Sequence, residues 1–497
     1  MASKHDVIVV GAGNAALCAA IAALEGGARV LVLEKASEGE RGGNTFFTGG
    51  GFRFPYEGID DVRTLIPDLS DAEVAEIDVG SYPEPAVRAD LMRVTEGLAD
   101  PGLVDTFVAR AFPTVQWMRE RAKVRWVLMY GRQAYRIDGK LRFWGGMIVE
   151  AVGAGEGLSD TLFASAVGQG ADVRYGAMAT ALLTDGRGDV CGVRIKTEHG
   201  IEEIEASAVV IAAGGFEANV EMRTRYLGPG WEFAKVRGTR HNTGAGIRMA
   251  LDVGAQSYGH WSSGHAVAWD LNAPPTGNRR IGDLYQKHSY PLGLIVNING
   301  DRFVDEGADL RNYTYAKYGR EILSQPQSVA FQLFDQQTVA MLRDEYRIRE
   351  VTKGEGATIG ELAESLGIDR EGLERTVAQY NAACPPDTAD RYNPAELDGV
   401  STAGIEPPKS NWALPLDQPP FVGFAVTCGL SFTFGGLRID AKSGAVLDTE
   451  DRPLPGLFAA GELVGGLFYH NYAGGSGLMA GAVFGRLAGE SAATATV

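Results

Sequence analysis

Residues 6–16 read Asp6-Val7-Ile8-Val9-Val10-Gly11-Ala12-Gly13-Asn14-Ala15-Ala16, and an alanine-rich run continues as far as Leu24. The β-branched run predicts a buried strand, the glycines predict a tight turn, and the alanines predict a helix. Gly11 permits the turn, Gly13 lets a pyrophosphate approach the backbone, and Ala16 is small enough for the helix to pack closely on the strand. This order predicts a Rossmann-like α/β domain that binds a dinucleotide.

A second strand is predicted from Ala28 to Leu33, and it ends at Glu34. Glu34 follows Gly11 by 23 residues, close to the offset of about 20 residues at which an acidic side chain accepts hydrogen bonds from a ribose diol. This carboxylate would repel a 2′-phosphate. The first motif therefore favours NAD or FAD and does not separate the two.

Further glycine-rich segments follow along the chain. Arg41–Thr45 and Thr48–Gly51 come directly after the second strand, Ala208–Phe216 is a strand that runs into two glycines, and Gly456–Glu462 is a strand that runs into glycine and an acid. Gly474–Leu478 then opens the last helix. Glycine makes up 66 of the 497 residues, nearly twice the usual share of about 7%, so many backbone segments must come close to something.

In their order and in their residues, these segments resemble a flavoprotein family that includes fumarate reductases, succinate dehydrogenase flavoprotein subunits and 3-ketosteroid dehydrogenases. The resemblance spans nearly the whole chain and implies FAD as the cofactor. It also implies that the last helix begins at the flavin pyrimidine edge, where the helix dipole would stabilise the negative charge of reduced flavin. Non-covalent binding is expected, because no histidine stands between Arg41 and Thr48, where the succinate dehydrogenase subunits carry theirs.

The cofactor-binding residues predicted from the motifs and the resemblance come from every glycine-rich segment. They are Gly11, Gly13, Asn14, Ala15, Ala16, Glu34, Lys35, Gly42, Gly43, Asn44, Thr45, Gly49, Gly50, Ala179, Ala213, Gly214, Gly461, Glu462, Gly475, Ser476, Gly477 and Leu478.

The resemblance further implies that the FAD-binding domain is split in the sequence by an inserted α+β cap. We expect residues 1–264 and 408–497 to form the FAD-binding domain and residues 265–407 to form the capping, substrate-binding domain. Two amphipathic helices are predicted inside the cap, over Thr358–Leu366 and Arg370–Ala383.

The candidate catalytic residues are inferred from the same resemblance. Gly300–Glu306 is similar to a family element that precedes an arginine which donates a proton opposite the flavin, and Arg311 stands one residue beyond the matching position. The stretch that continues to Tyr318 looks most like tricarballylate dehydrogenase. His265 falls close to where fumarate reductases place a histidine for the substrate carboxylate. His470 and Tyr472 are further candidates for polarising a carbonyl group.

The chain differs from the fumarate reductases at two positions where those enzymes bind the carboxylates of a C4 dicarboxylate. Phe432 stands where they have a histidine, and Tyr472 stands where they have an arginine. A pocket that loses two polar clamps and gains two aromatic rings should prefer a substrate that is bulkier or less charged than fumarate.

The family's proton relay is also absent. Its glutamate and arginine align with Gln286 and Ser289, so Lys287 or His288 would have to substitute for them.

Composition excludes several classes of partner. The net charge of −17, from 46 basic and 63 acidic residues, would repel a nucleic-acid backbone and an anionic lipid surface. The four cysteines are scattered without a C-x-x-C pair, and no uninterrupted apolar run of 18 residues occurs, so we expect neither a metal site nor membrane insertion. Scattered thiols and an N-terminus that runs directly into a strand favour a cytoplasmic location.

The leading expectation is an FAD-dependent oxidoreductase that acts on a C–C bond next to a carboxylate or carbonyl of a small molecule, similar to tricarballylate dehydrogenase. Two alternatives stay open. One is a dehydrogenase of a cyclic ketone or steroid-like substrate, with Tyr472 as the electrophile. The other is a flavin-bearing electron-transfer subunit that needs a partner, and the electron acceptor is not predicted.

Overall fold

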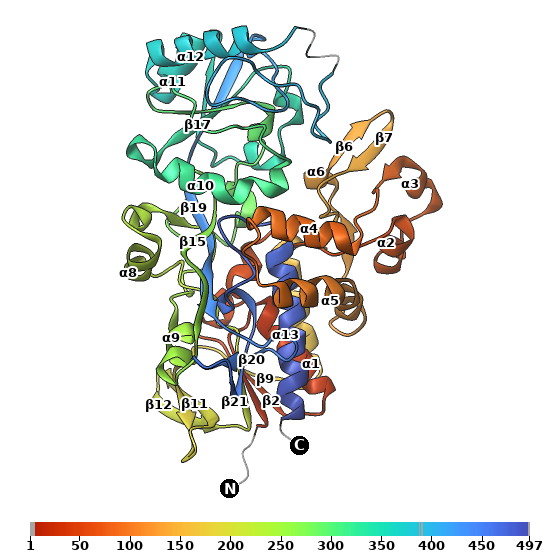
Figure 1. The fold of residues 1–497 in the computed structure, drawn as a ribbon, viewed down its shortest axis with the longest axis vertical. Coiled ribbons are helices and arrows are strands. Elements are labelled where there is room, and N and C mark those ends of the chain that lie inside the picture. The colour runs from red at the N-terminus through yellow and green to blue at the C-terminus, as the bar shows by residue number, and fades with distance from the viewer. Residues whose placement is uncertain (1–4, 387, 389–390, 496–497) are drawn as a thin grey trace.

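A six-stranded sheet forms the lower part of the protein (Figure 1). The computed structural model describes residues 5–386, 388 and 391–495. β1 lies near the middle of this sheet and is buried along its length, which explains its unbroken run of apolar residues. β20 alone runs antiparallel to its neighbour. The strands, in sheet order, are β20 (Ala445–Leu447), β21 (Pro453–Ala459), β13 (Ala208–Ile211), β1 (Val7–Val10), β2 (Val30–Leu33) and β9 (Asp172–Arg174).

Helices α1 (Asn14–Glu25) and α13 (Ser476–Thr494) lie side by side next to this sheet (Figure 1). A Cβ on Gly485 or Gly489 of α13 would collide with the backbone of α1 at Ala15 or Ala19, so the helix axes approach closely. Other elements of this part are α7 (Ala154–Gly168), α8 (Val220–Met222), α9 (Ala245–Asp252) and a three-stranded sheet of β10 (Met178–Thr184), β11 (Val190–Thr197) and β12 (Gly200–Glu205).

Two long antiparallel strands, β15 (Ser257–Asp270) and β19 (Phe421–Leu437), connect the lower part to the upper part (Figure 1). The upper sheet adds β14 (Lys235–Val236), β16 (Leu294–Asn297), β17 (Ala330–Phe334) and β18 (Lys353–Gly356). Helices α10 (Tyr315–Leu323), α11 (Ile359–Leu366) and α12 (Arg370–Ala383) pack there, and the last two match the predicted cap helices. The predicted cap boundary at residue 265 falls inside β15, and the boundaries stay a prediction.

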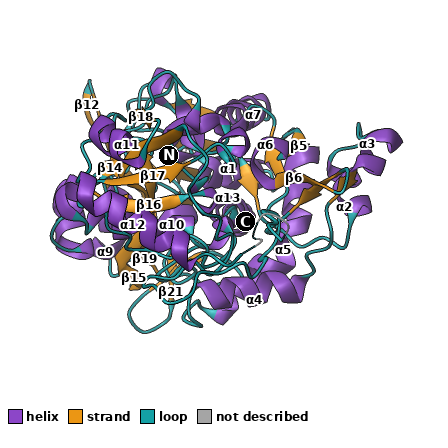
Figure 2. Cartoon of the chain, turned by 90° about the horizontal axis from the view of Figure 1, so that it is seen from above, coloured by secondary structure: helices purple, strands orange, loops and turns teal. Residues whose placement is uncertain are grey.

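A third part, not anticipated from the sequence, is built from residues 51–151. It stands beside the main body, with α2, α3 and β6 at one side when the molecule is seen from above (Figure 2). Its elements are β3 (Gly51–Phe52), α2 (Ile59–Leu65), α3 (Asp71–Glu76), β4 (Ile77–Asp78), α4 (Glu84–Val94), α5 (Pro101–Glu120), β5 (Trp126–Leu128), α6 (Tyr130–Gln133), β6 (Ala134–Ile137), β7 (Lys140–Phe143) and β8 (Val149–Ala151).

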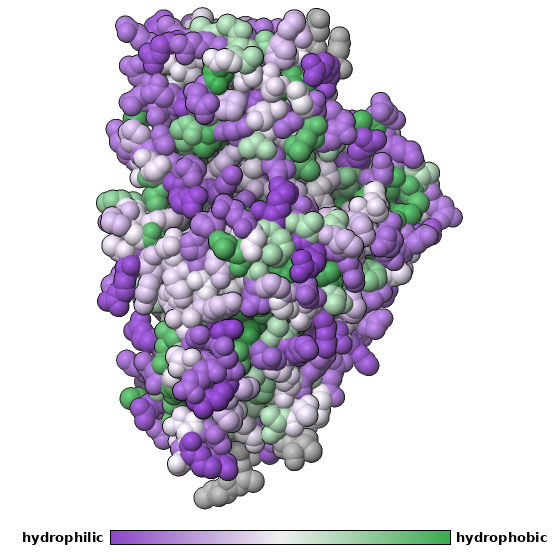
Figure 3. Space-filling view, in the orientation of Figure 1, coloured by the Kyte–Doolittle hydropathy of each residue, from purple (hydrophilic) through white to green (hydrophobic). Residues whose placement is uncertain are grey.

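On the face shown in Figure 3, hydrophilic residues cover much of the surface and apolar residues form small separate groups. Within the described part of the chain, no helix has both the length and the apolar character needed to cross a membrane.

Candidate active site

A continuous cavity runs from the glycine turn after β1 to the cap, and its lining extends in sequence from Val10 to Gly481. All of the predicted cofactor-binding residues line it except Ala16, Gly42 and Ser476. Ala16 is fully buried in the core, and the hydroxyl of Ser476 donates to the carbonyl of Ala473. Gly42 is buried as well, so the structure places these three in the layer behind the lining.

The end of the cavity near β1 fits the adenosine half of a dinucleotide. Gly11 has a φ of 107°, and a Cβ there would collide with the carbonyl of Ala212, so only glycine allows this turn. The backbone N–H of Asn14, at the start of α1, donates to Thr45 Oγ1 at 2.8 Å. Glu34 lines the cavity and is 6% exposed. Burial raises the pKa of Glu34, while its Oε1 accepts from the backbone N–H of Ala36 at 2.7 Å.

Two carboxyl groups, Glu217 and Glu462, meet at the cavity: Glu462 lines it, and Glu217 is fully buried behind the lining. Oε1 of Glu217 accepts from the side-chain amides of Asn44 and Asn242, each at 2.7 Å. Asn242 also donates to Glu462 Oε2 at 3.2 Å, and the backbone N–H of Thr433 donates to Glu462 Oε1 at 2.9 Å. Burial raises the pKa of both groups, and the pKa of Glu217 is raised further by its neighbour Glu462.

Burial and the neighbouring carboxyl group of Glu462 therefore both favour the protonated form of Glu217. Glu217 was not among the residues predicted from the sequence. A signal was present, because Glu217 follows a strand that runs into glycine, just as Glu462 does.

His265 lies at the substrate end of the cavity inside a box of aromatic rings. It pairs with Phe432 across β15 and β19, directly beside a register shift. Its ring centroid is 4.7 Å from that of Tyr472, 5.0 Å from Tyr315 and 5.1 Å from Phe432. Burial, followed by Arg237, lowers the pKa of His265 well below its usual range, so the ring is neutral. Neither ring nitrogen has a hydrogen-bond partner among the described residues.

Tyr472 faces the same box and accepts a hydrogen bond from the backbone N–H of Gly477, at the start of α13, at 3.0 Å. Burial raises the pKa of Tyr472, which keeps the phenol protonated. Because its oxygen already accepts from Gly477, its own proton is available to a ligand in the cavity.

Arg311 is 7% exposed and lines the cavity beside His288. Its Nη1 lies 3.5 Å from His288 Nδ1, and its Nη2 donates to the carbonyl of Arg132 at 3.2 Å. Burial, followed by Arg343, lowers the pKa of Arg311 to about 9. Burial and Arg311 together hold the pKa of His288 well below its usual range.

Lys287 is separated from this group. Its side chain is fully buried, with Nζ 3.4 Å from Asp270 Oδ2 and donating to the carbonyls of Leu284, Tyr285 and Gln286. Of the two relay candidates, only His288 lines the cavity.

Three cavity residues that no motif marks form a bridge: Arg132, Asp283 and Arg237. Asp283 Oδ2 accepts from Arg132 Nη1 at 2.8 Å, and Asp283 Oδ1 accepts from Arg237 Nη2 at 2.6 Å. Arg237 also donates to Ser431 Oγ at 3.0 Å. These residues come from three distant segments, so only the fold brings them together.

His470 was predicted to be a catalytic residue, but it does not line this cavity. It lines a separate hollow with Arg93, Lys317 and Arg320. Its backbone N–H donates to His260 Nδ1 at 3.0 Å, and the two rings lie 4.4 Å apart. His470 and Tyr472 are only two residues apart, but the loop turns their side chains to different hollows.

Residues 6–478 match the family described as FAD binding domain. A probable fumarate reductase of Shewanella frigidimarina is 30% identical over 495 residues, which cover 98% of this chain and 74% of that protein. The fold is similar to the open conformation of a flavocytochrome c3 fumarate reductase, with a TM-score of 0.71 and 26% identity over 100% of this chain and 79% of that one. It is also similar to a 3-ketosteroid Δ1-dehydrogenase from Sterolibacterium denitrificans, with a TM-score of 0.74 and 20% identity over 99% of each chain.

These similarities confirm the predicted fold class, family and cofactor. The chain belongs to the FAD-binding family that includes the fumarate reductases, and it is an FAD-dependent oxidoreductase.

Proposed function

We propose that the protein dehydrogenates, or reduces, a C–C bond next to a carboxylate or carbonyl group of a small molecule. The observation that supports this most directly is the set of buried, unpaired polar atoms at the substrate end of the cavity. Both nitrogens of His265 and Nε of Arg311 lack hydrogen-bond partners among the described residues. Buried polar atoms are almost always paired, so these atoms are expected to meet a polar ligand.

The cavity residues from the glycine turn after β1 to the start of α13 would hold FAD, which when bound accepts or supplies a hydride. Tyr472 and the N–H of His265 would donate hydrogen bonds to the substrate carbonyl or carboxylate. Such donors stabilise the charge that develops on oxygen by about 3 kcal/mol each and make the adjacent C–H more acidic. The surrounding rings of Phe432 and Tyr315 exclude water from these hydrogen bonds.

Arg311 would hold the proton that moves to or from the substrate carbon. His288 Nδ1, at 3.5 Å from Arg311 Nη1, would take the place of the missing relay. Neutral imidazole can accept a proton on one nitrogen and release one from the other. Lys287 cannot do this, because the carbonyls around it hold its ammonium group away from the cavity.

Three arginines in one cavity favour a substrate with several carboxylates. Arg132, Arg237 and Arg311 all line it, and Asp283 offsets only part of their charge. Tricarballylate is therefore the first substrate to test. Its dehydrogenation removes one hydride and one proton from adjacent carbons.

The test is turnover of tricarballylate by the purified FAD-bound chain with a dye acceptor, together with bleaching of the flavin absorbance. R237Q should raise KM for tricarballylate about tenfold to hundredfold, because a charged hydrogen bond is lost. R280Q is the matched control, since Arg280 is exposed and pairs with Glu350 outside the cavity. Absence of both turnover and bleaching would discard this substrate.

A cyclic ketone or ring-bearing acid is the second candidate, and the aromatic box favours it. The rings of Phe432, Phe468 and Tyr472 pack within 5.7 Å of one another at the cavity wall. A flat apolar ring would bury its surface there while Tyr472 donates to its ketone oxygen. Y472F should then lose about a hundredfold in kcat on the ketone, and a Y472F variant with full activity would exclude Tyr472 as the electrophile.

A further inference from the structure

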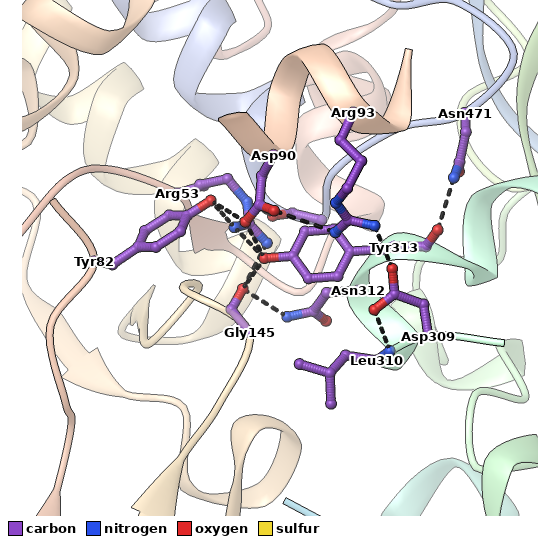
Figure 4. Close-up of polar contacts among 11 residues, drawn as sticks. Arg53, Tyr82, Asp90, Arg93, Gly145, Asp309, Leu310, Asn312, Tyr313 and Asn471 are labelled. Atoms are coloured by element: carbon purple, nitrogen blue, oxygen red, sulfur yellow. Dashed lines mark hydrogen bonds and ion pairs between the residues drawn. The ribbon is translucent and has the colours of Figure 1, made fainter. Parts of the chain in front are cut away.

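Arg53 is a completely buried arginine behind the cavity, just after β3. Its Nε donates to the carbonyl of Gly474 at 2.7 Å, and its Nη2 donates to the carbonyl of Gly145 at 2.7 Å. Its Nη1 donates to the phenol oxygens of Tyr82 at 2.7 Å and Tyr313 at 3.2 Å (Figure 4). None of these partners carries a formal charge.

The carboxylate that balances the charge of Arg53 is Asp90, and the phenol groups of Tyr82 and Tyr313 lie between them. Both Tyr82 and Tyr313 donate their protons to Asp90 Oδ2, at 2.8 Å and 2.6 Å (Figure 4). Each phenol thus accepts from Arg53 and donates to Asp90. Burial raises the pKa of both tyrosines, so they stay protonated and separate the two charges. The positive end of this arrangement points toward Gly474 and the negative end toward α4.

The same cluster fastens two segments that line the cavity. The turn that begins with Arg311 meets the loop before α13 through two bonds, from Gly474 N–H to the Asn312 carbonyl at 2.9 Å and from Asn471 Nδ2 to the Tyr313 carbonyl at 2.7 Å. The backbone N–H of Arg53 adds a bond to the carbonyl of Gly475 at 3.2 Å. Arg53 is therefore bonded to both segments at once.

We propose that Arg53 is a positioning residue that fixes the Arg311 turn against the start of α13 and holds a buried positive charge behind the place where the flavin pyrimidine edge is expected. This rests on the proposed function, which puts FAD in the cavity. A buried charge acts over a longer range than one in water, because screening by solvent is weak there. It adds to the positive end of the α13 dipole and favours the reduced, negatively charged flavin.

The charge, as distinct from the packing, can be tested with two substitutions of opposite sign. R53Q removes the positive charge and should lower the midpoint potential of bound FAD. The equilibrium constant for flavin reduction should fall at least tenfold, which corresponds to about 30 mV for a two-electron couple. D90N keeps an acceptor for the two phenols but removes the opposing negative charge, so it should raise the potential. A purely structural role would not move the potential in opposite directions.

Two control variants test whether the effect comes from the charge of Arg53: R53K keeps the charge and changes the side chain, and R93Q removes a charge nearer the surface. R53K should restore most of the potential, because it keeps the charge. R93Q should leave the potential unchanged, since the side chain of Arg93 is 51% exposed and faces Asp90 from the outer side. FAD affinity, measured by quenching of flavin fluorescence, is recorded for each variant.

The outcomes distinguish this proposal from the one on which it rests. Failure of the unsubstituted chain to bind FAD would overturn both. If FAD binds and substrate reduces it, but D90N leaves the potential unchanged or lowers it, only the role of Arg53 is overturned. D90N decides the matter even if R53Q does not fold, because Asp90 is not fully buried: 20% of its side chain is exposed.

Discussion

Arg311 is buried without a carboxylate among its contacts in the described part of the chain, and this fixes its pH behaviour. Because burial lowers its pKa to about 9, the guanidinium is charged below that pH and loses its proton above it. The rate of reduction, which takes a proton from Arg311, should fall as pH rises through about 9. The rate of dehydrogenation, which returns a proton to it, should rise over the same range.

R311Q should lower kcat by roughly a hundredfold to ten thousandfold and remove this pH limb. The measurement is the pH profile of kcat in each direction for both proteins. A profile that R311Q leaves in place would assign the proton to another group.

Glu217 should lower the free energy of unfolding at neutral pH, because folding raises the pKa of its carboxyl group. Its folded pKa lies well above the ordinary value of 4.5. The stability associated with its protonated form is therefore complete below about pH 4.5 and declines as pH rises, since only the unfolded chain gains from ionisation. E217Q mimics the protonated acid and should be more stable than the natural chain by on the order of 1 kcal/mol at pH 8.

Thermal unfolding of the FAD-bound proteins at pH 5 and pH 8 measures this effect, and the gain should shrink at the lower pH. E221Q is the control, because the Glu221 side chain is 60% exposed. A less stable E217Q at pH 8 would mean that Glu217 is ionised in the folded protein.

At the scale of single elements, the pairing of α1 with α13 depends on glycines four residues apart. Gly485 and Gly489 face the backbone of α1 with no room for a Cβ. G485A should push α13 away from α1 and destabilise the protein by about 1 to 3 kcal/mol. It should also weaken FAD binding, because both helices begin at the cavity.

G168A is the matched control, since Gly168 ends α7 with open space around it. Denaturant unfolding and flavin titration measure the two effects. Equal stability of G485A and G168A would show that the helices can separate without cost.

At the scale of the whole molecule, β15 and β19 make the lower and upper parts one mechanical unit. Both strands belong to the sheet of the upper part and extend from it into the lower part, so unfolding of one part should disturb the other. Calorimetry should show a single unfolding transition. FAD should raise its midpoint, because a ligand at a hundred times its dissociation constant adds about 2.7 kcal/mol.

The lining residues come from the lower part, from the third part and from the part of the cap that precedes residue 316, so FAD should protect a fold that unfolds as one unit. Two transitions, of which FAD shifts only one, would instead identify a cap that folds on its own.

The sequence alone determined the elements that bind a dinucleotide and the identity of the family. Strand, glycine turn and helix are local patterns, and the reasons for them, such as the missing Cβ at Gly11, act within a few residues. The aromatic replacements Phe432 and Tyr472 could be read in the same way, because each stands in a recognisable segment.

Tertiary structure alone decided several of the polar groups around the substrate end. Arg132, Arg237 and Asp283 come from distant segments with no motif, and their meeting depends on the packing of the third part against the cap. His470 and Tyr472 were indistinguishable in sequence, and only the loop conformation sends one of them to the cavity. Side-chain direction, burial and charge balance depend on contacts across the whole chain, whereas strand and helix depend on neighbours. For this reason the glycine-rich elements could be predicted from the sequence, but the bridge of Arg132, Asp283 and Arg237 could not.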